Sequence, residues 1–219
     1  MSFLKVHDAL FKAYGTQRWW PARTSFEVMV GAVLTQNTAW TNVEKAIAKL
    51  HGAGVMEAEL ILKAPQRRVA AWIRSAGYFN VKARRLRNFC AWYVEHGGEK
   101  RLRRLETAVL RHELLSVNGI GQETADDILL YAFHRPVFVI DAYTRRIFSR
   151  LQMLEGDEAY DTMREHIEAR LRRETRGKRE LAPLFNEYHA LIVRHGKDIC
   201  KPRPRCESCR LARRCPAAI

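Results

Sequence analysis

The chain has 219 residues, with 38 Lys and Arg against 24 Asp and Glu, and its formal charge is +14. This length suffices for one large helical domain or two small ones, and an apolar fraction of 47% excludes a disordered chain. No stretch is long and apolar enough to span a membrane, and the first residues lack the apolar core of a signal peptide. We therefore expect a cytoplasmic, nucleoid-associated bacterial or archaeal protein without a membrane partner, with a nuclear or organellar address as the alternative. The positive charge favours nucleic acid as a partner, although many basic proteins bind none.

Two aromatic segments lie near the N-terminus, at residues 18–21 (RWWP) and 34–40 (LTQNTAW). They flank residues 26–34, where apolar side chains recur at three- and four-residue spacing and predict a helix. Tryptophans most often contribute buried area, so core packing is one interpretation of Trp19 and Trp20. An indole can also stack on a cationic ring, which is the other interpretation.

Helical periodicity continues through the rest of the chain, interrupted by glycine- and proline-containing pairs that are typical of helix ends. The basic cluster at residues 82–87 is typical of a solvated helix face, with contact to phosphates as a second interpretation. Residues 137–140 could form a strand, but they are isolated, and we expect a buried extended linker. The sequence therefore predicts an all-α fold.

Residues 114–125 (LLSVNGIGQETA) join an apolar helix end to a second amphipathic helix through Gly119-Ile120-Gly121. Two glycines permit a tight turn with positive φ and let the backbone come close to a ligand. Backbone N–H groups at such a turn can bind an anion, for example a DNA phosphate. The alternative is an ordinary helix–loop–helix turn with glycines for packing.

Asp141 follows the apolar linker and precedes an expected helix at residues 142–151. An aspartate in that place is a good N-cap. A carboxylate fixed at one point of the fold could also stabilise a positive charge that develops in a reaction, and it could orient or deprotonate water. The two roles are compatible.

Four cysteines close the chain with the spacing Cys200-x5-Cys206-x2-Cys209-x5-Cys215, and Cys90 stands apart as an expected core thiol. Disulfides are not expected in a reducing compartment. Four thiolates suit zinc and a [4Fe–4S] cluster equally well, so the spacing alone leaves both open.

In their order along the chain, these motifs resemble those of the endonuclease III superfamily of helix-hairpin-helix DNA glycosylases. Gln36 matches the glutamine of the family's Leu-x-x-Gln segment, and Asp141 follows Gly121 by 20 residues, as the family's essential aspartate does. Trp-Trp-Pro, Thr-Gln-Asn-Thr followed closely by Trp40, and Gly-Ile-Gly-x-Glu are specifically similar to the 3-methyladenine DNA glycosylases of that superfamily. The resemblance implies a base-excision-repair enzyme that acts on double-stranded DNA containing a damaged base. We expect the protein to be a monomer.

The resemblance also implies roles for single residues. Asp141 is expected to be catalytic, and Gln36 to fill the space left by the flipped nucleotide. Trp40 and one of Trp19 or Trp20 are expected to sandwich the base, which favours an alkylated purine such as 3-methyladenine. The expected DNA contacts are Gly119, Ile120, Gly121, Gln122 and Thr124. Two alternatives are a glycosylase for oxidised pyrimidines or mismatched bases, and a non-catalytic module that binds damaged DNA.

Glu123 occupies the position at which bifunctional members of the family carry a lysine that attacks the sugar. A carboxylate cannot form the Schiff base that lyase chemistry requires. We therefore expect a monofunctional glycosylase with weak or absent AP-lyase activity. Glu123 itself is either a first-turn residue favoured by the helix dipole or a contact of the flipped base.

For the four C-terminal cysteines, the resemblance implies a structural [4Fe–4S] cluster, in a loop whose first interval is one residue shorter than the family's. It also implies two helical domains with a DNA cleft between them. Residues 22–134 are expected to form the domain with the hairpin, and residues 1–21 plus 135–219 the domain with the iron–sulfur loop.

Overall fold

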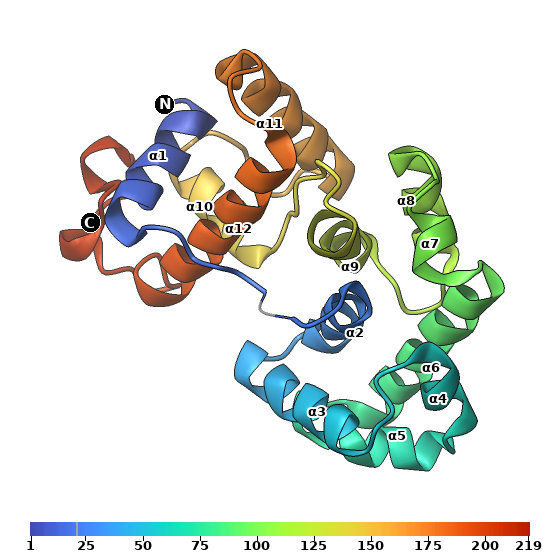
Figure 1. Ribbon diagram of the computed structural model, residues 1–219. Helices are drawn as coiled ribbons and strands as arrows, with labels where there is room; N and C mark the ends of the chain where they lie inside the picture. Colours follow the sequence, from blue (N-terminus) through green and yellow to red (C-terminus); the bar gives the residue numbers. More distant parts are fainter. Residues whose placement is uncertain (21) are drawn as a thin grey trace. The chain divides into compact units, whose positions relative to one another are not determined.

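The computed structural model describes residues 1–20 and 22–219, and this part of the chain is helical without any strand (Figure 1). The predicted all-α fold is thereby confirmed. The chain divides into two compact units. We call Ala22–Phe133 the hairpin unit, and we call residues 1–20 with His134–Ile219 the cysteine unit. Among the described residues, no helix combines the length and apolar character needed to cross a membrane.

The helices follow one another closely, with short connections. The hairpin unit contains α2 (Ser25–Thr35), α3 (Trp40–Gly52), α4 (Ala58–Lys63), α5 (Gln66–Trp72), the 3₁₀ helix η1 (Arg74–Ala76), α6 (Phe79–Glu95), α7 (Gly98–Leu102), α8 (Thr107–Ser116), α9 (Gln122–Asp127) and the π-helix η2 (Ile128–Ala132). The cysteine unit contains α1 (Phe3–Tyr14), α10 (Ala142–Arg150), α11 (Tyr160–Thr175), α12 (Leu181–Asp198) and the 3₁₀ helices η3 (Cys206–Ser208) and η4 (Ala212–Arg214).

Helix α2 forms the centre of the hairpin unit. Every residue from Phe26 to Leu34 is buried, and the helix contacts α3, α6, α9 and η2. A helix that is apolar on all sides needs neighbours on all sides, which explains this central place. Its first turn is capped by the Thr24 hydroxyl, which accepts a hydrogen bond from the Glu27 N–H at 3.1 Å.

The basic cluster of α6 does not form a solvated face, so that interpretation of the sequence was wrong. Lys82 is only 2% exposed, Arg85 and Arg87 are half-buried, and Arg84 alone among these four is exposed. Arg87 donates to three carbonyls at the C-terminal end of α4, at 2.6–3.0 Å. The last carbonyls of a helix have no N–H partner within the helix. Long basic side chains can supply the hydrogen-bond donors that these carbonyls lack.

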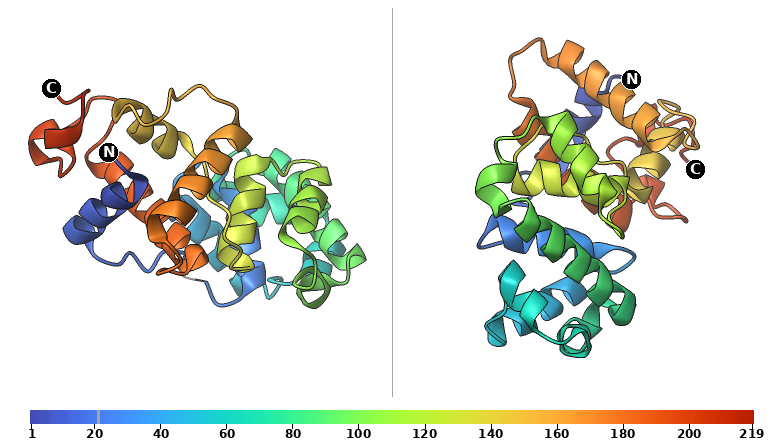
Figure 2. Two further views of the ribbon diagram at one scale, coloured as in Figure 1. Left: turned by 90° about the horizontal axis from the view of Figure 1, so that it is seen from above. Right: turned by 90° about the vertical axis from the view of Figure 1, so that its right-hand side faces the viewer.

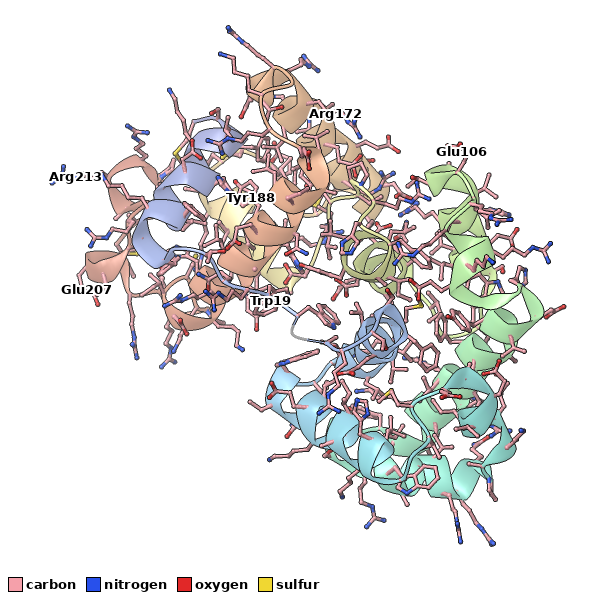
Figure 3. The ribbon with its side chains drawn as sticks, in the orientation of Figure 1. Trp19, Glu106, Arg172, Tyr188, Glu207 and Arg213 are labelled. Atoms are coloured by element: carbon pink, nitrogen blue, oxygen red, sulfur yellow. The ribbon has the colours of Figure 1, made fainter. Side chains whose placement is uncertain are left out.

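Aromatic side chains make the core of the cysteine unit, where α12 lies against both α1 and α10 (Figures 1 and 2). Tyr188 of α12 is fully buried (labelled in Figure 3), and its hydroxyl donates to the Phe3 carbonyl of α1 at 2.7 Å. Its ring meets Phe138 and Phe148 edge-on, with centroids 5.6 and 6.1 Å apart. This edge-to-face geometry is the one that aromatic quadrupoles favour.

Residues 137–140 form the buried extended linker that the sequence predicts. Side chains satisfy two of its backbone N–H groups: the Phe138 N–H donates to Glu168 Oε1 at 2.9 Å, and the Ile140 N–H donates to the Tyr160 hydroxyl at 3.3 Å. The linker delivers Asp141 to the start of α10. Cys90 is likewise a core thiol as expected, fully buried, and burial raises its pKa to about 12.

Candidate functional site

The hairpin lies between α8 and α9, and the described residues place its two glycines in different environments. Gly119 has φ +100°, a conformation that L side chains rarely adopt, and a Cβ atom there would overlap the side chain of Arg85. Gly121 has φ −95° and is the N-cap of α9, and a Cβ atom there would meet no described atom within 4 Å. The fold therefore requires glycine at 119 but not at 121.

Gln36 ends α2 and is bonded to the hairpin within the same unit. Its Nε2 donates to the Gly119 carbonyl and to Thr124 Oγ1, both at 3.0 Å. Its Oε1 accepts a hydrogen bond from Arg85 Nη1. The structure thus brings three of the predicted site residues, Gln36, Gly119 and Thr124, into direct contact.

The other predicted residues of the hairpin unit lie at helix starts. Gln122 and Glu123 are exposed in the first turn of α9, whereas Ile120 is buried. Trp40 is the half-buried first residue of α3, and its Nε1 donates to Glu44 Oε1 at 2.9 Å. An acidic residue in the first turn, such as Glu123, is stabilised by the helix dipole.

Trp19 and Trp20 belong to the cysteine unit, and both are half-buried (Trp19 is labelled in Figure 3). Their indole nitrogens are buried. Pro21, the last residue of the Trp-Trp-Pro motif, lies outside the described residues.

Asp141 is the N-cap of α10, and it is 8% exposed. Its Oδ1 accepts a hydrogen bond from the Thr144 N–H at 2.7 Å, and its Oδ2 lies 3.5 Å from His189 Nε2 of α12. Burial alone would raise the pKa of Asp141, but the hydrogen bond and charge of His189, together with the Thr144 bonds, hold that pKa below its usual value. The carboxyl group is therefore ionised at neutral pH.

The four C-terminal cysteines are half-buried and line one cavity together with Arg150 of α10 and Ile199. Four polar groups approach their sulfur atoms. Arg150 Nη1 donates to Cys200 Sγ at 3.3 Å, the Leu211 N–H donates to Cys209 Sγ at 3.4 Å, and His195 Nε2 lies 3.5 Å from Cys209 Sγ. The Arg150 carbonyl accepts from Cys215 Sγ at 3.5 Å. Among the described side chains, no three His, Cys, Asp or Glu residues are arranged as ligands of one metal ion.

The chemistry of this sulfur set fits a positively charged metal centre, which an iron–sulfur core or a zinc ion can supply. Burial raises the pKa of Cys209, and the charges of Cys200, Cys215 and Cys206 raise it further. Four neighbouring thiolates therefore need a positively charged group among them, and hydrogen-bond donors around the sulfurs are what ligating thiolates commonly have.

Two residues that contact predicted site residues are ones that the sequence motifs did not single out. His189 faces Asp141, and Arg85 holds Gln36. The sequence contained a signal that Lys82 of α6 is buried, because Lys82 stands four residues before Leu86 on the apolar face of that helix.

The comparisons with known proteins agree with this arrangement. Residues 30–173 match the family model described as HhH-GPD superfamily base excision DNA repair protein. A protein of Methanocaldococcus jannaschii, provisionally named as a DNA repair glycosylase, is 44% identical over 96% of this chain and 94% of its own. Endonuclease III of Sulfolobus acidocaldarius is 31% identical over 85% of this chain and 79% of its own. The crystal structure of a 3-methyladenine DNA glycosylase from H. pylori bound to 1,N6-ethenoadenine superposes with a TM-score of 0.79 at 26% identity, covering 90% of this chain and 98% of that one.

The chain belongs to the HhH-GPD superfamily of base excision DNA repair proteins. It is a base-excision DNA repair glycosylase.

Proposed function

We propose that this enzyme is a monofunctional DNA glycosylase that hydrolyses the N-glycosidic bond of an alkylated purine, with 3-methyladenine as the favoured base. The observation that carries this proposal is Asp141, a buried carboxylate held ionised by His189 and Thr144. The similarity to the glycosylase bound to 1,N6-ethenoadenine supports an altered purine as the substrate.

Asp141 acts on the sugar. As the glycosidic bond lengthens, positive charge develops on the deoxyribose, and a nearby carboxylate stabilises it. The Thr144 N–H engages Oδ1, and His189 Nε2 lies 3.5 Å from Oδ2, so the carboxylate is held in place to orient the attacking water. His189 positions that carboxylate and keeps it charged.

Glu123 accounts for the absence of a lyase step. The lysine of bifunctional relatives would stand at this position, and a carboxylate forms no Schiff base with the sugar. Water is then the nucleophile, and the reaction ends with an abasic site. The position of Glu123 in the first turn of α9 supports the interpretation that the helix dipole favours an acidic residue there.

The hairpin binds the DNA backbone through Gly119, Ile120, Gly121, Gln122 and Thr124. Gly121 supports this role, because neither its φ nor the space around it in the described chain requires glycine. What a side chain there would obstruct is a ligand approaching the backbone, and a phosphate is the ligand that backbone N–H groups attract.

Base recognition falls to Trp40 and one of Trp19 or Trp20. An alkylated purine carries positive charge, and stacking it on an indole contributes about 1 kcal/mol or more. Gln36 occupies the space that the flipped nucleotide leaves.

The ligands of a [4Fe–4S] cluster are Cys200, Cys206, Cys209 and Cys215, which line their common cavity beside Arg150. When bound, the cluster supplies cross-linking of the C-terminal loop and no step of base excision. Arg150 ties that loop to α10 through the Cys200 sulfur and the Lys201 carbonyl.

A panel of duplexes tests the proposal. Single-turnover excision is measured on duplexes with 3-methyladenine, 1,N6-ethenoadenine, an oxidised pyrimidine or a G·T mismatch, with borohydride added in parallel. We expect excision of the altered purines and no covalent enzyme–DNA adduct. Preference for the oxidised pyrimidine or the mismatch would instead support an endonuclease III-like specificity, and an adduct would contradict the monofunctional assignment. Binding without excision of any of these bases would indicate a non-catalytic damage-binding module.

A further inference from the structure

One side of α6 carries three polar residues at three-residue spacing, and each of them bonds to a helix end or a loop of the hairpin unit. Lys82 Nζ donates to the Leu34 carbonyl at 2.9 Å and to the Ala76 carbonyl at 2.7 Å. Arg85 bonds to Gln36, and Asn88 Nδ2 donates to the Asn118 carbonyl at 3.1 Å. The helix therefore joins the end of α2 to the hairpin loop.

Gln36 is the point at which these bonds converge. Its two amide hydrogens are donated to the Gly119 carbonyl and to Thr124 Oγ1, while its oxygen accepts from Arg85. These contacts determine which end of the carboxamide is oxygen and which is nitrogen. The stem of Arg85 also covers Gly119, which is why a Cβ atom cannot be placed there.

We propose that Arg85 is a positioning residue for nucleotide extrusion: it holds Gln36 in one orientation against the hairpin, so that the side chain that fills the vacated space is ordered before DNA binds. This inference rests on the proposed role of Gln36. A side chain that is already ordered does not lose conformational entropy when the complex forms. The hairpin, which contacts the phosphates, and the Gln36 side chain then move together as one rigid unit.

The alternative for an arginine in this place is a direct contact with a phosphate. The two roles differ in a measurable way. Loss of a phosphate contact weakens binding to all duplexes and lowers the salt dependence of binding by about one unit of slope. Loss of a positioning contact affects extrusion and leaves that slope unchanged.

The experiment uses Arg85→Met, because the straight methionine side chain still covers Gly119 while the guanidinium is removed. Arg84→Met is the matched control, since Arg84 is the exposed neighbour on the same helix and loses the same charge. Each substitution is also made together with Gln36→Ala. Two readouts are taken: single-turnover excision, and the fluorescence change of 2-aminopurine placed opposite an abasic-site analogue, at several salt concentrations.

We expect Arg85→Met to lower the excision rate and the fluorescence amplitude by about two- to tenfold, the range for ordering one long side chain. Affinity for undamaged duplex and its salt slope should equal those of Arg84→Met. In the Gln36→Ala background, Arg85→Met should cause no further loss. An equal loss in both backgrounds, or a lower salt slope with unchanged fluorescence, would overturn the inference.

The fluorescence readout separates this inference from the proposed function, because it needs no excision. If the wild-type protein removes none of the tested bases but the 2-aminopurine signal depends on Arg85 only when Gln36 is present, the positioning role stands and the substrate assignment fails. If excision of altered purines is normal and the signal is indifferent to both residues, the substrate assignment stands and the positioning role fails.

Discussion

Lys82 provides a test of how the hairpin unit is held together. Its side chain is almost completely buried, and its ammonium group donates to the backbone carbonyls of Leu34 and Ala76. Burial, with a smaller effect from Arg85, lowers the pKa of Lys82 from 10.5 to about 8. Replacing Lys82 by methionine removes the titrating group while keeping a chain of similar length.

The sign of the effect follows from proton linkage. Between the folded and unfolded pKa values, the unfolded chain holds the proton on Lys82 and the folded chain does not, so stability rises with pH. Below pH 8 the folded protein keeps a charged group in a site that disfavours charge. The pKa of Lys82 falls from 10.5 to about 8, a difference of about 2.5. At 1.36 kcal/mol for each pKa unit, this difference corresponds to about 3 kcal/mol of unfolding free energy.

Urea unfolding at a series of pH values from about 7 to 11 measures this contribution as a difference between two proteins. We expect the unfolding free energy of the wild type, minus that of Lys82→Met, to increase by about 3 kcal/mol across this range. Groups that titrate equally in both proteins cancel. Lys45→Met serves as the control, because Lys45 is exposed on α3 of the same unit, and its difference from the wild type should vary little with pH. A flat difference for Lys82→Met would refute the reasoning, and a difference that falls with pH would mean that the folded state favours the ammonium form.

The remaining predictions concern the chemistry. Asp141→Asn should retain duplex binding and lose base release. Excision by the wild-type enzyme should persist as the pH falls through the mildly acidic range, because the pKa of Asp141 lies below its usual value. Binding assays and pH–rate profiles of both proteins check these expectations. Trp40→Ala should raise KM for a charged alkylated purine by about fivefold, the equivalent of one cation–π contact, and should affect an uncharged base less; release of the two bases in parallel measures the difference. Cys215→Ser should lose iron and the visible absorbance of the cluster. Excision should fall only in proportion to the loss of folded C-terminal loop, which iron analysis together with circular dichroism tests. A colourless wild-type protein containing zinc would contradict the assignment.

Much of the fold could be predicted from local pattern alone. The hairpin residues 114–125 combine apolar periodicity with two glycines, and the linker at residues 137–140 is an apolar run too short and isolated for a sheet. Both features are determined by residues that are close together in the chain, and for this reason they could be predicted from the sequence. The structure confirms the all-α fold and the buried linker, and residues 142–150 form the helix expected after Asp141.

The polar contacts of α6 could not be predicted in the same way. A run of lysines and arginines has the same composition whether the charges face water or cap the ends of neighbouring helices. Lys82 is buried and Arg87 is half-buried because they donate hydrogen bonds to carbonyls at the ends of α2 and α4. These helix ends are distant from α6 in the sequence. The position of Lys82 on an apolar helix face was the available signal, and it indicates burial only when the neighbouring helix ends are known.

The two interpretations of Asp141, N-cap and catalytic carboxylate, turn out to depend on different oxygen atoms. The capping bond uses Oδ1 and fixes the carboxylate at the start of α10, whereas Oδ2 faces His189. Capping therefore supports the proposed chemistry, because a side chain fixed by one oxygen presents the other without further loss of conformational freedom. The cost is burial of a charge, which the Thr144 N–H and His189 offset, as the lowered pKa of Asp141 indicates. An aspartate at this position can thus be required by the helix and by the reaction for the same physical reason.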